Sequence, residues 1–205
     1  GTLARIRGDW LTFRDYYLHG REICDRLGAE AGVSIAEMSL GSLAYLQRNI
    51  SQAQAYFESV MKAGWVQSNP LVSGLFGGFL GYAELLMGNK KDAEKKLRVS
   101  LESAAVFINQ NQSPWYLYLG PILEGKAHLE LSEGRAERAA YIFGASKTQR
   151  EKENIALSEA ERPDYEAVIA KARSAIGDAA FDQAFAKGQA MTIEQAIQYA
   201  LAEDE

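Results

Sequence analysis

The 205-residue chain is poor in cysteine and histidine, and this excludes several kinds of site. Cys24 is the one cysteine, so no disulfide can form within the chain, which suits a reducing cytoplasm. His19 and His128 belong to no HExxH pattern and to no cysteine cluster, whereas a structural zinc site needs about four ligands. We therefore expect no metal site and no cofactor, and we expect Cys24 to be a small buried residue on a helix face.

An excess of positive charge and a long hydrophobic run are missing as well. Lysine and arginine number 22 against 27 aspartates and glutamates, which gives a net charge of -5. Direct nucleic-acid binding would need a basic surface, so we do not expect it. The longest apolar segment, residues 71–87, contains Glu84 and is shorter than the roughly 20 residues of a membrane-spanning helix. No basic stretch followed by an apolar core opens the sequence, so we expect no secretory signal and a cytoplasmic protein without a membrane partner.

What the chain does contain is a pattern that returns at nearly constant spacing. A turn residue is followed five positions later by a core residue, small in three copies, and four positions after that by a large apolar residue. The core positions lie about 40, 40 and 46 residues apart, and such periods are typical of helical solenoids. The pattern predicts an all-α fold of stacked antiparallel helix hairpins whose surface binds a partner. The four copies are Gly8–Phe13–Tyr17, Arg48–Ala53–Phe57, Gly88–Ala93–Leu97 and Gly134–Ala139–Phe143.

Capping residues predict where the helices of the array begin and end. Asp9 can cap a helix that runs to about residue 27, and Asn49 can cap another. Asn69 followed by Pro70 is a strong helix start, because proline in the first turn lacks only an amide hydrogen that would be unpaired there. Ser113-Pro114 repeats this device. Gly28 and Gly32 are expected to break the chain before a helix at residues 34–46.

After residue 150 the spacing changes, which indicates a different C-terminal region. Ser158 with Glu161 and Thr192 with Gln195 form two capping boxes, while Gly177 begins a helix and Gly188 is expected to end it. Three short helices that leave the repeat can cover the open end of a stack. The predicted organisation is a repeat array at residues 1–150, with an incomplete first unit, and a helical cap at residues 151–205.

Two units resemble the tetratricopeptide repeat, in which a Leu-Gly pair is followed by a small residue twelve positions on and an aromatic residue four later. The resemblance is partial, because no unit keeps the proline of the second helix and the period exceeds the usual value of about 34. It implies a right-handed superhelical solenoid of the longer-helix variety. The matching residues are Leu40-Gly41, Ala53 and Phe57; Leu80-Gly81 and Ala93, with Leu97 in place of the aromatic; and, in the third unit, Ala127, Ala139 and Phe143.

The C-terminal region carries a more specific resemblance, at residues 135–146, 161–165, 176–181 and 188–200. These segments resemble the C-terminal part of bacterial signal-transduction ATPases with numerous domains, a family that includes LuxR-type and maltose-regulator-like transcription regulators and cyclase-linked relatives. In that family the helical array looks like a sensor that receives an inducer or a protein and restrains a nucleotide-binding switch. The resemblance implies ATPase and output domains in the parent chain and a binding role for this piece.

The repeat register also selects candidate binding residues, on the helix that lines the concave face in this repeat class. Tyrosines at such positions suit a binding surface, because they supply contact area at low entropic cost. The alternative is that they pack between neighbouring units, and the choice between the concave and the convex face stays open. The candidates are Met38, Ser42 and Tyr45; Tyr82 and Leu85; Glu124 and His128; and Trp115 at the end of the groove.

Nothing in the chain has the spacing of a catalytic motif, so we expect no enzyme activity. The glycine-rich residues 74–81 lack the lysine and hydroxyl residue of a phosphate loop, and close helix packing explains them. Asp178 and Asp182 are expected to serve the start of a helix. Two alternatives remain: a plain protein-protein scaffold without a nucleotide switch in the parent, and a dimer through the apolar side of residues 10–17 left uncovered by the incomplete first unit.

Overall fold

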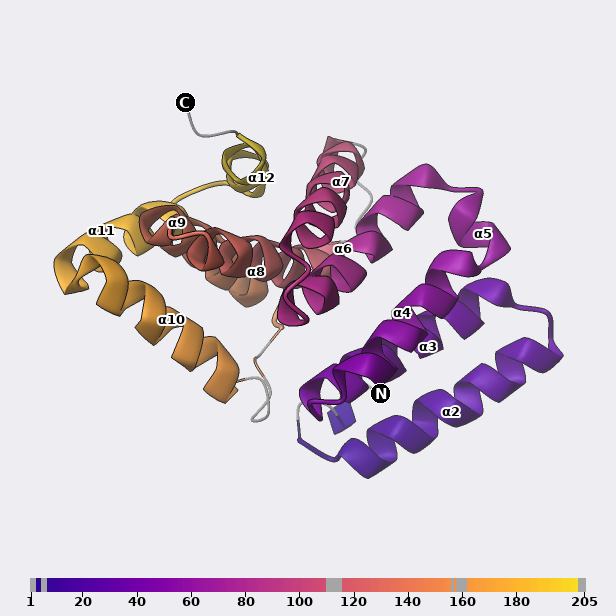
Figure 1. The fold of residues 1–205 in the computed structure, drawn as a ribbon. Helices are drawn as coiled ribbons and strands as arrows, with labels where there is room; N and C mark the ends of the chain where they lie inside the picture. The colour runs from indigo at the N-terminus through magenta and orange to yellow at the C-terminus, as the bar shows by residue number, and fades with distance from the viewer. Residues whose placement is uncertain (1–2, 5–6, 110–115, 156, 158–161, 203–205) are drawn as a thin grey trace.

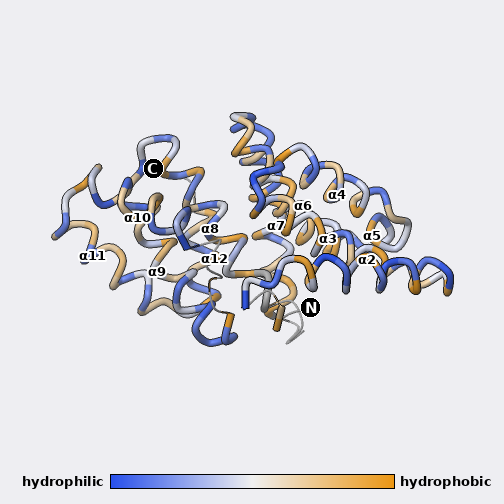
Figure 2. The backbone as a smooth tube through the Cα atoms, turned by 90° about the horizontal axis from the view of Figure 1, so that it is seen from below, coloured by the Kyte–Doolittle hydropathy of each residue, from blue (hydrophilic) through white to orange (hydrophobic). Residues whose placement is uncertain are grey.

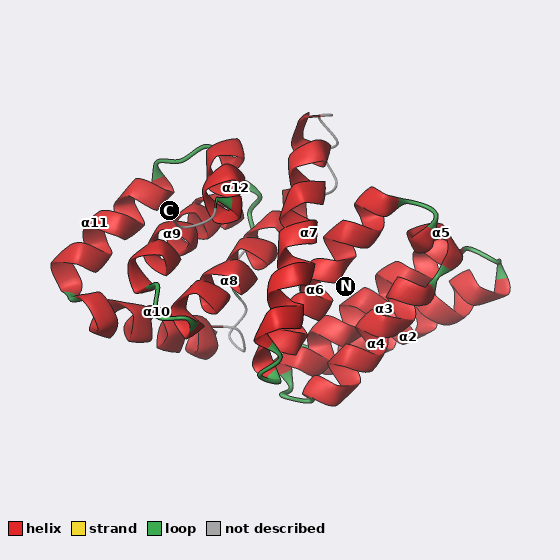
Figure 3. Cartoon of the chain, turned by 45° about the horizontal axis from the view of Figure 1, so that its top comes forward, coloured by secondary structure: helices red, strands yellow, loops and turns green. Residues whose placement is uncertain are grey.

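The computed structural model describes residues 3–4, 7–109, 116–155, 157 and 162–202. Over these residues the regular elements are helices, with no strand, so the expected all-α class is confirmed (Figure 3). Hydrophobic and hydrophilic positions are mixed along the tubes of helices such as α2 and α4, as helices that bury one face require (Figure 2). The helices are α2 (Trp10–Arg26), α3 (Glu30–Leu46), α4 (Ile50–Lys62), α5 (Gly64–Gln67), α6 (Pro70–Leu86), α7 (Lys90–Asn109), α8 (Tyr116–Ser132), α9 (Ala136–Lys152), α10 (Arg162–Ile176), α11 (Asp178–Gln189) and α12 (Ile193–Leu201).

Neighbouring helices pack as hairpins joined by short turns, and the recurring turn residue has a backbone reason. Gly8, Arg48, Gly88 and Gly134 all have positive φ, from 63° to 87°. Glycine adopts this left-handed conformation without a steric penalty, which accounts for three of the four copies. At the α6–α7 turn the Gly88 amide donates to the Leu85 carbonyl at 3.0 Å, so the turn also closes the end of α6.

The small residues of the pattern lie in the core. Ala53, Ala93 and Ala139 are completely buried. A Cβ on Gly81 would lie 3.2 Å from the Ala93 carbonyl oxygen, so small residues on both helices let α6 and α7 approach closely. The glycine-rich segment does the same, since a Cβ on Gly74 would meet the Ser103 Oγ at 1.9 Å. Close packing of α6 on α7, as expected, explains these glycines.

Several predicted helix starts are confirmed by side-chain hydrogen bonds. The carboxylate of Asp9 accepts from the Thr12 amide at 3.1 Å, and Asn49 and Asn69 accept from amides three residues on. Thr192 and Gln195 make both bonds of the capping box. Ser113, Pro114, Ser158 and Glu161 lie outside the described residues.

Gly32, expected to break the chain before the next helix, lies inside that helix, and Gly188, expected to end a helix, lies one residue before its end. Helix α3 begins at Glu30, and a Cβ on Gly32 would be 2.4 Å from the Cys24 Sγ. Helix α11 continues to Gln189, and a Cβ on Gly188 would be 1.9 Å from the Tyr141 carbonyl oxygen. The expectation for Gly32 was wrong, because this glycine allows a close approach between α2 and α3. The expected end near Gly188 agrees with α11 to within one residue, and this glycine also allows a close approach between helices. Cys24 itself is only partly buried.

The helices follow an arc from α2 through α6 and α7 to α9 and α10 (Figure 1). Helix α11 packs along α9, α10 contacts α9 and α11, and α12 lies against α7, α8 and α9. We call the N-terminal side of the arc, α2 to α4, and its C-terminal side, α9 to α11, its two arms (Figure 1). The arms touch where Arg48, in the α3–α4 turn, pairs with Asp164 of α10. At the N-terminal arm Phe13 is only 4% exposed, so the expectation that it lies uncovered was wrong: it packs on the ring of Tyr17.

Candidate functional site

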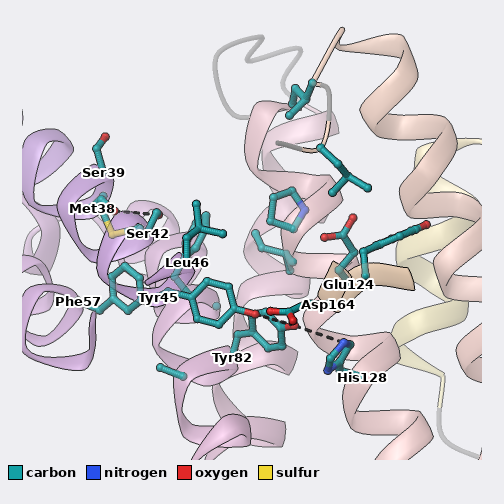
Figure 4. Close-up of a pocket in the computed structure, with 18 of the residues that line it drawn as sticks. Met38, Ser39, Ser42, Tyr45, Leu46, Phe57, Tyr82, Glu124, His128 and Asp164 are labelled. Carbon is teal, nitrogen blue, oxygen red and sulfur yellow. Dashed lines mark hydrogen bonds between the residues drawn. The ribbon is translucent and has the colours of Figure 1, made fainter. Parts of the chain in front are cut away.

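A cavity of about 310 Å³ lies inside the arc, between its two arms (Figure 4). Its wall is mostly apolar and takes residues from α2, α3, α4, α6, α8, α9 and α10. Small-molecule sites are concave and mostly apolar, with a few convergent polar groups. Six of the eight candidate residues line this cavity: Met38, Ser42, Tyr45, Tyr82, Glu124 and His128.

The other two candidates are not among the lining residues. Leu85 is partly buried on α6, one turn beyond Tyr82, and does not line the cavity. Trp115 lies outside the described residues. The repeat register thus brings together residues of three helices that are far apart in the chain.

Three polar aromatic side chains form a row across the cavity, one each from α3, α6 and α8. The Tyr45 hydroxyl donates to the Tyr82 hydroxyl at 3.3 Å, and the Tyr82 Oη lies 3.4 Å from the His128 Nε2 (Figure 4). The rings are also in contact, with centroids 5.4 Å apart for the tyrosines and 5.2 Å for Tyr82 and His128. The three helices α3, α6 and α8 thus place these side chains next to one another.

Burial keeps this row uncharged. It lowers the pKa of His128 to about 4, and the positive charge of Lys171 on α10 adds to the effect. Burial also raises the pKa of Tyr45 and of Tyr82. At neutral pH the row therefore consists of a neutral imidazole and two phenols, which bind through hydrogen bonds and ring contacts.

Glu124 is held in place by α9. The Arg150 Nη2 donates to its Oε2 at 2.7 Å, and the Ser146 hydroxyl donates to its Oε1 at 2.9 Å. Arg150 is 7% exposed, and a Cβ on Gly120 would lie 2.9 Å from the Arg150 Cγ, so glycine leaves room for the arginine stem. The Glu124 carboxylate has a counter-charge, and both its oxygens accept hydrogen bonds. It is therefore a fixed part of the cavity wall.

Helix α10 completes the cavity with Asp164 and Tyr165. Asp164 pairs with Arg48 across the arms of the arc. The Tyr165 hydroxyl is buried and has no hydrogen-bond partner among the described residues, while its ring packs edge-on against Phe143 at 5.9 Å. Burial and the negative charge of Glu124 raise the pKa of Tyr165.

The residues of α9 and α10 are the ones that sequence reasoning missed. Asp164 and Tyr165 follow no repeat register, because α10 reaches the cavity by folding back toward the first hairpin. Arg150 lies on α9 and enters the site through its pair with Glu124 of α8. Asp164 and Tyr165 belong to a segment that carries the C-terminal resemblance, and this is the signal that could have drawn attention to them.

A second charged cluster lies away from the cavity and joins helices. Glu130 is 1% exposed in its side chain and pairs with Lys126 at 2.6 Å, with Arg138 at 3.3 Å and with Arg135. The same Arg138 donates to the Tyr199 carbonyl at 2.7 Å. This cluster ties the end of α12 to α8 and α9, and we assign it a structural role.

Metal and membrane chemistry find no support in the part of the chain that the structure describes. It contains no group of three or more histidine, cysteine, aspartate or glutamate side chains placed to hold a metal ion. None of its helices has the length and apolar character needed to cross a membrane. Comparisons with protein-family models, with curated proteins and with solved structures give no match to this chain.

Proposed function

We propose that this chain is a non-catalytic binding module that holds a small-molecule inducer in the cavity between the arms of the arc. The observation that carries the proposal is the cavity of about 310 Å³, into which the row of Tyr45, Tyr82 and His128 points from three hairpins. This size falls at the lower end of the range of about 300 to 1,000 Å³ found for ligand pockets. In this proposal the array is a TPR-like right-handed solenoid with a C-terminal helical cap.

The chemistry of the cavity favours binding over catalysis. A general base works best with a pKa near the working pH, and that of His128 is about 4. Glu124 is already paired with Arg150 and Ser146, so its carboxylate is engaged in the free protein. Both groups suit a preformed wall that positions a ligand.

We propose further that the module is the sensor arm of a larger bacterial signal-transduction ATPase or transcription regulator in the cytoplasm. The resemblance of residues 135–146 and 161–165 supports this. A ligand held between the arms would favour one separation of the arms, which is a means of signalling to ATPase and output domains. The native reading frame tests the idea: a GxxxxGK[ST] loop upstream is expected, and flanks with repeats alone would favour the plain scaffold.

A thermal-shift screen tests the binding role directly. A metabolite library is compared on the wild-type chain and on Ser42→Trp, in which an indole ring fills the cavity next to Tyr45. A ligand of the cavity should raise the melting temperature of the wild type and leave that of Ser42→Trp unchanged, because binding to the native state alone adds stability. The matched control is Ser59→Trp on the exposed face of α4, which should respond like the wild type.

The screen has a clear negative outcome. If no compound distinguishes wild type from Ser42→Trp, the cavity is not a small-molecule site. Should Ser42→Trp fail to fold by circular dichroism, Ser39→Trp places the ring in the same cavity from the neighbouring position on α3.

A further inference from the structure

The charged side chains that line the cavity are all paired. Glu124 is neutralised by Arg150, and Asp164 is neutralised by Arg48. Lys171 influences His128 electrostatically, but it is exposed and does not line the cavity. A ligand that carried a net charge would therefore enter the cavity without a counter-charge, and burying an unpaired charge is costly.

The remaining wall is apolar and largely aromatic. It includes Met38, Phe57, Phe79, Ile122 and Phe143. Aromatic side chains prefer edge-on and offset contacts with other rings, as the T-shaped contact of His128 with Phe143 at 6.0 Å already shows. Such a wall favours a flat ring system over a flexible polar chain.

Besides Tyr165, whose hydroxyl has no partner among the described residues, Tyr45 has unused hydrogen-bonding capacity. In the row, the Tyr45 hydroxyl donates to Tyr82, and its own oxygen lone pairs still accept hydrogen bonds. A ligand hydroxyl placed beside Tyr45 would extend the row by one donor. This sets the orientation of the ligand in an otherwise apolar site.

Building on the proposed binding role, we infer that the ligand is an uncharged, mostly apolar ring compound with a hydroxyl group that donates to Tyr45. The inference goes beyond the presence of a cavity, because it excludes organic anions, organic cations and highly hydroxylated compounds. It follows from the paired charges, the aromatic wall and the open end of the hydroxyl row together.

Three probes with one ring system and different charge test this inference by isothermal titration at neutral pH: naphthalenemethanol, naphthoate and naphthalenemethylammonium. The alcohol should bind saturably with one molecule per chain. We expect it to bind about tenfold or more tightly than either ion, because the ions bring an unpaired charge into the cavity. Ser42→Trp should remove this binding, and Ser59→Trp should retain it.

A variant of the row tests the orientation. Tyr45→Phe keeps the ring and removes the hydroxyl, so the affinity for naphthalenemethanol should fall about fivefold, in line with the loss of one hydrogen bond. The matched control is Tyr56→Phe on α4, which does not line the cavity and should leave the affinity unchanged.

The outcomes separate this inference from the proposed function. If an ion binds as tightly as the alcohol and Ser42→Trp removes that binding, the ligand class is wrong while the cavity remains a binding site. If the alcohol fails to bind but the metabolite screen finds a cavity ligand, the ligand class is again wrong. If neither the probes nor the library respond to Ser42→Trp, the proposed function itself falls. An unchanged affinity in Tyr45→Phe would contradict the hydroxyl contact.

Discussion

At the scale of single residues, His128 links the stability of the protein to pH. Burial, helped by Lys171, lowers its pKa from 6.5 to about 4. Between these values the unfolded chain binds a proton that the folded chain does not, so the free energy of unfolding decreases as the pH falls through this window. A shift of this size corresponds to roughly 3 kcal/mol at most. In urea unfolding at pH 7 and pH 4.5, His128→Gln should lose less stability than the wild type; an equal loss would contradict a buried neutral imidazole.

Tyr165 carries a second prediction at this scale. Its hydroxyl is buried without a partner among the described residues, and such a group costs about 1 to 3 kcal/mol. Tyr165→Phe should therefore raise the free energy of unfolding by about 1 kcal/mol. Tyr82→Phe is the matched control, because its hydroxyl is hydrogen-bonded and its removal should destabilise the fold. Denaturant unfolding of both variants measures these changes in stability. A destabilised Tyr165→Phe would contradict the claim that the unpartnered hydroxyl destabilises the fold.

At the scale of helices, the close crossing of α9 and α11 depends on glycine. A Cβ on Gly188 would lie 1.9 Å from the Tyr141 carbonyl oxygen, which is backbone and cannot rotate away. We expect Gly188→Ala to lower the free energy of unfolding by about 3 kcal/mol, as overpacking does. Gly20→Ala in α2 is the control: nothing lies within 4 Å of its Cβ, so it should stabilise the protein by up to about 1 kcal/mol. Equal melting temperatures for the two variants would refute the packing argument.

The same glycines show how far helices can be predicted from the sequence. Caps such as Asp9 and Asn69 act within one turn, so the residues beside them were enough to place the helix starts. Gly32 was misread as a break before the helix, because the reason for this glycine is the side chain of Cys24 on another helix. Helix α5 was missed as well, since four residues carry too little pattern.

At the scale of the whole molecule, part of the cavity could be predicted and part could not. The repeat register identified Tyr45, Tyr82 and His128, which line the same cavity from α3, α6 and α8. Asp164 was missed because its place depends on how α10 returns toward the first hairpins. Arg150 was missed because it enters the site only through its pair with Glu124 across α8 and α9. The periodic pattern ends near residue 150, so it contains no information on the path of α10.

The contact between the two arms, the pair of Arg48 and Asp164, should affect local motion more than global stability. Arg48 and Asp164 are both partly exposed, so their pair should contribute no more than about 1 kcal/mol to global stability. Its effect should instead be local: Asp164→Asn should speed amide hydrogen exchange in the α3–α4 turn and the first turns of α10. Glu102→Gln, which breaks the exposed pair with Arg98 inside α7, should leave that exchange unchanged. Because Asp164 lines the cavity, a cavity ligand should slow the exchange again in Asp164→Asn. If neither effect is seen, the arms are held by the remaining packing alone.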